Sequence, residues 1–480
     1  MTLLRTQSLC PVCLRRIEAS YVQSVVTDAR TVVLRKTCPD HGTFSVPVWR
    51  ESGEGAAATP PFVSWSRPKN PSYPANPRTP IRDGCPYDCG LCPAHAQHTC
   101  TGLFEVTKRC DMACPVCYAQ AGSVSNPLRG ESDDIPLDVI AMQMDTLKGA
   151  SGPCNVQISG GEPTVRDDLP QIICMARQRG FGLVQVNTNG LRLARQQGYA
   201  RSLRDAGLDS IYLQWDGVRE SSFMTLRGRE CLEFKRRAVR NCADAGLGVV
   251  LVATVVRGVN EGELGDLLRL ALELGPAVRG LHIQPAAFFG RYPWQLEEAP
   301  RLTLPDVMAA LVNQAPELVS PSHMHPPGCE NELCSFSAVY RRVRRNGQPG
   351  LEWLPDAGQS CCNSSEGAPH TSGATVPPPA EEGARKAKQF VAMHWKGGEA
   401  AGETSTAESG ADGFSRFLAQ AGAEQRFTLS SMAFQDALSL DLDRVRGCCI
   451  HVVRPDGRMI PFCLHNLTAS NGTRLYGEES

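Results

Sequence analysis

The chain has 480 residues, a formal net charge of −1 and 21 cysteines, and its charged residues form no long block of one sign. This length is enough for about two or three domains, and the balanced charge gives no case for nucleic-acid binding. The longest clearly apolar run, residues 247–256, is too short to cross a bilayer, and residues 1–13 lack the apolar core of a secretion signal. We therefore expect a cytoplasmic protein without a transmembrane segment, whose clustered cysteines bind metal instead of forming disulfides.

Residues 1–50 are predicted to form a small metal-binding knuckle. Cys10 and Cys13 have C-x2-C spacing, Cys38 and His41 have C-x2-H spacing, and a strand is expected over residues 31–34 between them. Three thiolates and one imidazole would close a tetrahedral structural zinc site. His41 could instead be a turn residue, with another ligand recruited from elsewhere in the chain.

Residues 51–100 combine a linker with a first cysteine cluster. Residues 51–80 are rich in Pro, Ala and Ser, as in a linker or an irregular wrap. Cys85, Cys89 and Cys92 follow with C-x3-C-x2-C spacing, and Cys100 lies close behind. Four thiolates complete the coordination of a [4Fe–4S] cluster. These four residues are therefore predicted to hold a sealed auxiliary cluster.

A second cysteine triad has the same spacing but no fourth cysteine close to it. Cys110, Cys114 and Cys117 follow an expected strand at residues 103–107. Three thiolates leave one iron of a [4Fe–4S] cluster open to bind another molecule. Alone, such a triad could equally be a zinc knuckle. The missing fourth cysteine favours a cluster that holds a ligand.

Residues 101–290 alternate between expected strands and expected helices. Strands are predicted at residues 103–107, 155–159, 183–187, 210–214, 249–256 and 280–284. Helices are predicted at residues 136–148, 169–178, 192–206, 231–245 and 263–274. This alternation predicts an α/β fold with a parallel sheet, either an open doubly wound sheet or a partial barrel. In both cases the working site lies beyond the carboxyl ends of the strands.

Glycine, acidic and amide residues follow three of these strands. The second strand is followed by Gly160, Gly161, Glu162, Pro163 and Thr164, the third by Asn187 and Asn189, and the fourth by Asp216. Glycines let the backbone approach a ligand closely. The alternative is that each motif is a turn, because Gly-Gly, Asn-Gly and Asp-Gly pairs are common turn formers.

Residues 291–480 break the alternation and carry further cysteines. Residues 363–412 are dominated by Pro, Ala, Gly, Ser, Glu and Lys and are predicted to be a disordered or variable low-complexity insertion. Structure is expected to resume near Phe414 and to end in a hairpin that turns at residues 455–458. The cysteines outside the insertion are Cys329, Cys334, Cys361, Cys362, Cys448, Cys449 and Cys463.

The triad directly after one strand, with the Gly160–Thr164 motif at the end of the next, resembles the radical S-adenosylmethionine (SAM) superfamily. The resemblance implies a partial (β/α)6 barrel whose triad binds a [4Fe–4S] cluster, with SAM chelated at the open iron. Reductive cleavage of SAM would give a 5′-deoxyadenosyl radical that abstracts hydrogen. Glu162 would accept a hydrogen bond from the SAM ammonium group. Asn187, Asn189 and Asp216 would lie near SAM or the substrate.

The cysteine motifs at the two ends of the chain narrow this resemblance. Together with the string at residues 84–100, they resemble the tetraether lipid synthase group and the related class D radical SAM methylases, over most of residues 8–335 and 414–466. This likeness implies one or two auxiliary [4Fe–4S] clusters and either zinc or a rubredoxin-like mononuclear iron at the N-terminal site. A second auxiliary cluster would use Cys329, Cys334, Cys463 and one of Cys448 or Cys449, with Cys449 preferred. The pair Cys361–Cys362 departs from the group's pattern.

The expected activity is radical alkylation, such as methyl transfer, or carbon–carbon bond formation on a small-molecule or lipid substrate, with alkyl transfer preferred. The resemblance also implies an electron donor such as flavodoxin or ferredoxin, and a folate one-carbon donor. Two alternatives stay open. One is a peptide-modifying radical SAM enzyme with a SPASM-like extension, and the other is a non-catalytic iron–sulfur or zinc scaffold.

Overall fold

The computed structural model describes residues 1–25, 30–54, 58–122, 133–355, 377–396 and 426–477. Three sequence expectations lie wholly or mostly outside these residues: the Cys361–Cys362 pair, most of the insertion at 363–412, and the restart near Phe414. Among the described helices, none is both long enough and apolar enough to span a membrane.

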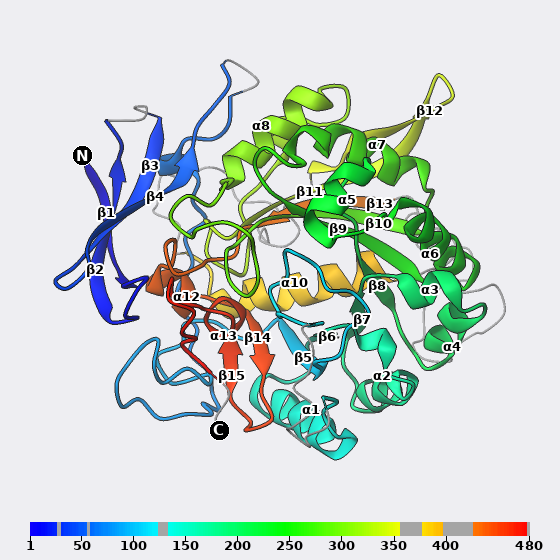
Figure 1. Ribbon diagram of the computed structural model, residues 1–480, viewed down its shortest axis with the longest axis horizontal. Helices are drawn as coiled ribbons and strands as arrows, with labels where there is room; N and C mark the ends of the chain where they lie inside the picture. Colours follow the sequence, from blue (N-terminus) through cyan, green and yellow to red (C-terminus); the bar gives the residue numbers. More distant parts are fainter. Residues whose placement is uncertain (26–29, 55–57, 123–132, 356–376, 397–425, 478–480) are drawn as a thin grey trace, which may run out of the picture.

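The N-terminal unit is a four-stranded antiparallel sheet that is separate from the main sheet (Figure 1, blue). Its strands are β1 (Thr2–Leu9), β2 (Arg16–Gln23), β3 (Thr31–Cys38) and β4 (Gly42–Arg50), paired in chain order. Tyr21, Leu34 and Trp49 are almost fully buried and give this small sheet its core. The expected strand at residues 31–34 is the first half of β3.

Hydrogen bonds attach this sheet to the C-terminal part of the chain. Ser8 Oγ donates to the carbonyl of Leu440 at 2.5 Å, and the buried Lys36 Nζ donates to the carbonyl of Ala437 at 2.6 Å. The Tyr21 hydroxyl donates to the Asp441 carboxylate in a buried pair. The N-terminal unit is thus fixed to residues 437–441 by polar contacts as well as by packing.

The main sheet has eleven strands, in the order β12-β11-β13-β10-β9-β8-β7-β6-β5-β14-β15. Its middle consists of β5 (Thr101–Thr107), β6 (Asn155–Gly160), β7 (Leu183–Thr188), β8 (Ser210–Gln214), β9 (Gly248–Val255) and β10 (Val278–Pro285), all parallel. An open doubly wound sheet reverses its strand order at a switch point. These six strands keep chain order without a reversal, so the α/β prediction is confirmed and the barrel form is the one observed.

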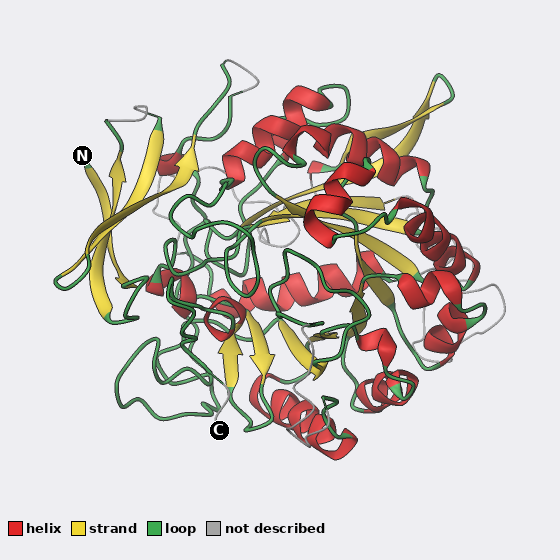
Figure 2. Ribbon diagram, in the orientation of Figure 1, coloured by secondary structure: helices red, strands yellow, loops and turns green. Residues whose placement is uncertain are grey.

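Helices cover the outer face of this sheet, and the strands lie inside them (Figures 1 and 2). They are α1 (Leu137–Ser151), α2 (Leu169–Gln178), α3 (Leu191–Arg195), α4 (Tyr199–Asp205), α5 (Glu220–Arg227), α6 (Leu232–Asp244) and α7 (Leu264–Glu273). The single helix expected over residues 192–206 is two helices. The chain leaves the helical conformation at Gln196 and begins α4 after Gly198, whose φ of +77° favours glycine.

Both edges of the sheet are extended by strands from the C-terminal third of the chain. One edge gains β13 (Arg426–Met432), β11 (Ser335–Arg345) and β12 (Gln348–Trp353), and the other gains β14 (Ile450–Val453) and β15 (Met459–Pro461). The turn between β14 and β15 is the predicted hairpin, and Gly457 adopts φ +82° within it. The α-helices described in this region are α8 (Leu304–Gln314), α10 (Ala380–Trp395), α12 (Leu442–Arg446) and α13 (Phe462–His465).

The prediction of a disordered insertion at residues 363–412 is wrong for its described part, because α10 (Ala380–Trp395) lies within it. Ala384, Ala387, Val391 and Trp395 recur at helical spacing, and Trp395 packs on Tyr212 of β8 with ring centroids 5.9 Å apart. The helix contacts β9, β10 and β13 and crosses the middle of the molecule in Figure 1. Its Ala- and Lys-rich composition hid this apolar face from the sequence analysis.

Candidate active site

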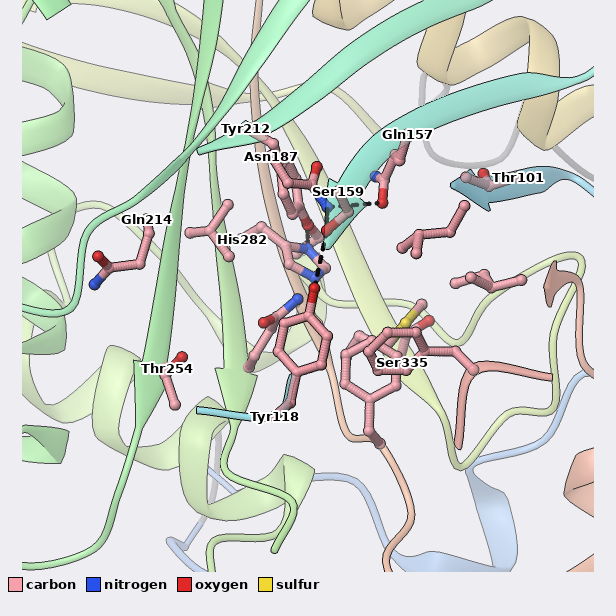
Figure 3. Close-up of a pocket in the computed structure, with 18 of the residues that line it drawn as sticks. Thr101, Tyr118, Gln157, Ser159, Asn187, Tyr212, Gln214, Thr254, His282 and Ser335 are labelled. Carbon is pink, nitrogen blue, oxygen red and sulfur yellow. Dashed lines mark hydrogen bonds between the residues drawn. The ribbon is translucent and has the colours of Figure 1, made fainter. Parts of the chain in front are cut away.

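A cavity of about 430 Å³ lies against the inner face of the six parallel strands. Side chains that alternate along these strands point into it, as the two-residue period of a strand requires (Figure 3). The strand residues that line it include Gln157, Ser159, Gln185, Asn187, Tyr212, Gln214, Thr254, His282 and Gln284. Tyr118 also faces this group, and its hydroxyl lies 2.9 Å from Ser159 Oγ. The lining is therefore rich in neutral amide and hydroxyl groups.

Cys110, Cys114 and Cys117 line the cavity in the segment that follows β5. Arg291 fixes this segment, because its backbone exchanges two hydrogen bonds with Cys117, at 2.8 and 2.9 Å, and its Nε donates to the Cys114 carbonyl. Burial raises the pKa of the Cys110 thiol to about 12 and also raises that of Cys114. Three thiols in one short segment beside the cavity give a donor set that fits a bound iron–sulfur cluster.

Gly160 and Gly161 allow the next strand end to pack against the backbone that leads to the triad. A Cβ at Gly161 would lie 2.2 Å from the Arg109 carbonyl oxygen, and one at Gly160 would lie 2.4 Å from that of Thr107. The sequence analysis expected these glycines to approach a ligand closely, but here they approach the protein backbone. Both residues also line the cavity. Any larger residue would displace the triad segment.

Glu162 is almost fully buried and receives four hydrogen bonds from the protein. Its Oε1 accepts from the Thr164 amide at 3.0 Å, the Thr164 hydroxyl at 2.6 Å and the Thr188 hydroxyl at 2.7 Å, and its Oε2 accepts from the Asn189 amide at 2.7 Å. Burial raises its pKa, while these donors act in the opposite direction. The carboxylate braces the ends of β6 and β7, and its contact with a SAM ammonium group stays a prediction. Pro163 and Thr164 are buried in the short η3 turn (Pro163–Val165).

Asn187 and Asn189 also line the cavity, but their surroundings differ. Asn189 Nδ2 donates to Asp111 at 2.7 Å, and its Oδ1 accepts from the Leu191 amide, so this side chain joins the triad segment to α3. Asn187 Nδ2 has long contacts of 3.4 and 3.5 Å, and its buried Oδ1 accepts no hydrogen bond from the described residues. Asn187 therefore keeps an acceptor for a ligand.

Asp216 does not face the cavity as the sequence predicted. Its side chain is fully buried and forms a two-pronged ion pair with Arg227, with both N–O distances at 2.7 Å. It also accepts from the Thr254 amide at 3.1 Å. Arg227 lines the cavity and donates to the Val116 carbonyl within the triad segment. The sequence analysis missed Arg227, because an arginine at the end of a helix is common and indicates no particular function.

The structure corrects the predicted grouping of Cys100 with Cys85, Cys89 and Cys92. The sulfurs of Cys100, Cys329 and Cys449 all lie within 4.8 Å of one another. This grouping arises because β14 pairs with β5, and the Cys100 amide donates to the Cys449 carbonyl at 2.8 Å. Sequence spacing cannot show this strand pairing. We call these three residues the second thiol group, and they line the same cavity as the triad.

The other cysteines expected to bind clusters lie in two further neighbourhoods. The thiols of Cys85 and Cys89 are hydrogen-bonded to each other, and Cys92 is close enough to perturb their ionisation. In the second neighbourhood, Arg444 donates to Cys334 Sγ at 3.4 Å, and the Gln435 amide donates to Cys463 Sγ at 3.3 Å. Cluster ligation by these residues stays a prediction.

The four residues of the predicted N-terminal metal site do come together. His41 Nδ1 lies 3.7 Å from Cys10 Sγ and 3.5 Å from Cys38 Sγ, and Cys13 Sγ lies 4.0 Å from Cys38 Sγ. A tetrahedral zinc ion with ordinary bond lengths places its ligand atoms roughly 3.5–3.8 Å apart. A hydrogen bond from His41 lowers the pKa of the Cys38 thiol to about 6, which favours the thiolate that a metal needs.

Comparisons with known proteins agree with this division of the chain. A model of the radical SAM superfamily matches residues 104–271, and a model described as the HMPTM N-terminal zinc ribbon domain matches residues 2–50. A 7,8-dihydro-6-hydroxymethylpterin dimethyltransferase of Methanocaldococcus jannaschii is 30% identical over 490 residues, covering 96% of this chain and 93% of the relative. A probable GTP 3′,8-cyclase of Methanothermobacter thermautotrophicus is 27% identical over 38% of this chain and 58% of its own length.

Solved structures match over smaller parts of the fold. The crystal structure of a maturase of the [FeFe]-hydrogenase has a TM-score of 0.36 and 13% identity, and covers 46% of this chain and 50% of that chain. Methylornithine synthase has a TM-score of 0.32 and 13% identity, and covers 45% of this chain and 64% of that chain.

Proposed function

Because this chain belongs to the radical SAM superfamily, we propose that it cleaves SAM at a [4Fe–4S] cluster held by Cys110, Cys114 and Cys117 and methylates a pterin-type small molecule. The observation that carries this proposal is the position of the triad. Its three thiols line one cavity with a row of inward-facing amides, and no fourth cysteine stands beside them in the sequence. The similarity to a pterin dimethyltransferase over almost the whole chain supports the substrate class.

The chain's own residues would place SAM in this cavity. When bound, the cluster supplies one electron to the SAM sulfonium group, whose carbon–sulfur bond then breaks. Gly160 and Gly161 hold the β6 end against the triad segment, and Glu162 fixes the β7 end beside it. Arg227, whose charge is paired with Asp216, donates to the Val116 carbonyl and so positions the triad segment beside the cavity.

The amide row supports a neutral heterocyclic substrate. Gln157, Gln185, Asn187, Gln214 and Gln284 line one wall of the cavity. Gln185 and Gln214 use both ends of their amides within the protein, so a substrate is expected to meet this wall mainly through Asn187 and Gln284. A pterin ring carries neighbouring donors and acceptors along its edge, so it can satisfy such a wall. Asn187 Oδ1, the buried acceptor without a partner among the described residues, would gain a hydrogen bond when that ring binds.

Two further metal functions belong to this proposal. We infer that the second thiol group holds an auxiliary iron–sulfur cluster near the substrate, and that Cys10, Cys13, Cys38 and His41 hold a structural zinc ion. A one-electron donor such as flavodoxin or ferredoxin would reduce the triad cluster, and a folate would supply the one-carbon unit.

Cleavage of SAM tests the role of the triad. The full chain is reconstituted anaerobically with iron and sulfide and reduced, and 5′-deoxyadenosine is measured by mass spectrometry. Cys114→Ala is expected to lower its yield by more than about 100-fold, since loss of even an outer partner of a metal site often costs 10–100-fold. Cys174→Ala, at an exposed cysteine of α2, is the matched control and should keep the wild-type yield. Equal yields from the two variants would refute the assignment.

The substrate class is tested with 7,8-dihydro-6-hydroxymethylpterin as the probe. Incubation with the reduced enzyme, SAM and a methylene-bearing folate should add one or two methyl groups to the pterin. A protein that makes 5′-deoxyadenosine but leaves this pterin unchanged, and instead joins or alkylates a lipid, would show that the substrate class is wrong while the SAM chemistry is right.

A further inference from the structure

The carboxylate of Glu330 contacts the second thiol group directly. Its Oε2 lies 2.7 Å from Cys329 Sγ and 3.8 Å from Cys449 Sγ. Its other oxygen, Oε1, accepts from the Ser335 hydroxyl at 2.5 Å. The Ser335 contact holds the carboxylate in one orientation, with Oε2 turned toward the two sulfurs. Nothing in the proposed SAM chemistry uses this residue.

The second thiol group supplies three ligands, and an iron–sulfur cluster takes four. Within the described residues, no fourth Cys, His, Asp or Glu atom lies within 4.8 Å of all three sulfurs at once. Cys334, Cys448 and Cys463, the other nearby cysteines, perturb one another's ionisation and so lie together as a separate group. Arg444 donates to Cys334, the Ile450 amide approaches Cys448 at 3.5 Å, and the Gln435 amide donates to Cys463. Glu330 is the acidic group that touches two of the three thiols.

Glu330 also faces the cavity in which the triad lies. The cavity is lined by Cys114 and Cys117 at one side and by Cys329, Cys449 and Glu330 at another. A molecule that fills this space can therefore reach both thiol groups. An oxygen ligand binds iron in such a cluster less strongly than a thiolate does, because soft sulfur donors suit these clusters better. A carboxylate at this position can thus be exchanged for a substrate atom.

We propose that Glu330 is the fourth ligand of the auxiliary cluster held by Cys100, Cys329 and Cys449, and that it occupies the coordination position that faces the cavity. This inference depends on the auxiliary cluster proposed above, but not on SAM cleavage or on the identity of the substrate. It makes the auxiliary cluster a substrate-facing centre with one replaceable ligand.

Mössbauer spectroscopy of the anaerobically reconstituted, ⁵⁷Fe-labelled full chain tests this ligand. An iron with an oxygen ligand has a larger isomer shift than one bound only by sulfur. Glu330→Cys should remove one iron equivalent from the high-shift component, because the new thiolate completes an all-sulfur cluster. Glu330→Gln keeps an oxygen that can accept from Ser335, and it should shift the electron paramagnetic resonance signal of the reduced auxiliary cluster. Glu332→Gln, two residues away, is the control and should give wild-type spectra.

Three results would overturn the proposal. Spectra of Glu330→Gln and Glu330→Cys that match the wild type would show that Glu330 is not a ligand. Wild-type iron content in Cys329→Ala would show that the second thiol group holds no cluster. A wild-type spectrum with no high-shift iron beyond the one at the open position of the triad cluster would show that sulfur fills the fourth position. Failure of the proposed function is seen separately, because a protein that makes no 5′-deoxyadenosine can still show the Glu330-dependent spectrum.

Discussion

The N-terminal sheet and the central cavity both bring cysteines together, but the cysteines of the cavity also border open space. In the sheet, Cys10, Cys13, Cys38 and His41 bring four ligand atoms within 4.8 Å of one another, which is a complete tetrahedral set. In the cavity, the triad stands beside open space of about 430 Å³ that is lined by both polar and apolar side chains. A complete ligand set stabilises a fold, whereas an incomplete one beside a cavity can bind a reactant. We therefore expect residues of the same type to serve structure in one region and chemistry in the other.

The largest expected effect that separates the two regions comes from Cys38→Ala. We expect loss of one zinc equivalent and a local loss of several kcal/mol of protection in β3 and β4, since zinc binding contributes about 10–16 kcal/mol in zinc-finger peptides. Metal analysis and hydrogen exchange measure these changes. Thr37→Ala, at the exposed neighbouring position, should change neither. If Cys38→Ala abolishes 5′-deoxyadenosine formation as completely as Cys114→Ala, the two regions are not independent.

A smaller effect is expected from Asp216→Asn in the cavity wall. The change leaves the Arg227 charge buried without its partner, so the free energy of unfolding should fall by about 3–5 kcal/mol. Anaerobic denaturant unfolding measures this loss. Asp167→Asn breaks the exposed ion pair with Arg192, in which Asp167 is 92% exposed, and should cost less than about 1 kcal/mol. Similar costs for the two variants would contradict the buried role of the Asp216–Arg227 pair.

The smallest expected effect is a pH dependence from His282 in the cavity. Burial lowers the pKa of His282 from 6.5 to about 4, so the folded state disfavours the protonated ring. The stability that depends on its neutral form is complete above pH 6.5 and is lost as the pH falls toward 4. Each pH unit in this window is worth about 1.4 kcal/mol, so about 2 kcal/mol should be lost between pH 6.5 and 5.

His282→Gln should remove this part of the slope when unfolding midpoints are compared across that range. Ser430→Ala removes the hydroxyl that lies 2.8 Å from His282 Nδ1 but keeps the buried ring, so its slope should match the wild type. Equal slopes for His282→Gln and the wild type would show that another group titrates.

The sequence predicted most of the parallel strands because their apolar runs and flanking turns are local signals. It also predicted the grouping of Cys10, Cys13, Cys38 and His41, because each pair has short spacing within one hairpin turn. It failed for Cys100, whose partners Cys329 and Cys449 arrive through the pairing of β14 with β5. It failed for Asp216 because the side chain of a residue that follows a strand can point either toward the cavity or away from it. The direction is set here by the ion pair with the buried Arg227, which the sequence does not reveal. The spacing of residues in a single sequence does not reveal which distant segments come into contact.

The position of α10 has a consequence for how the holoprotein is assembled. Ala384 of this helix packs on the second thiol group, and its carbonyl oxygen lies 3.6 Å from Cys100 Sγ. α10 therefore covers part of the second thiol group, while the cavity borders the rest of it. We therefore expect assembly to follow an order, in which the metal is inserted first and α10 then packs over it. The apoprotein and the mature protein would then differ in how stably α10 is docked.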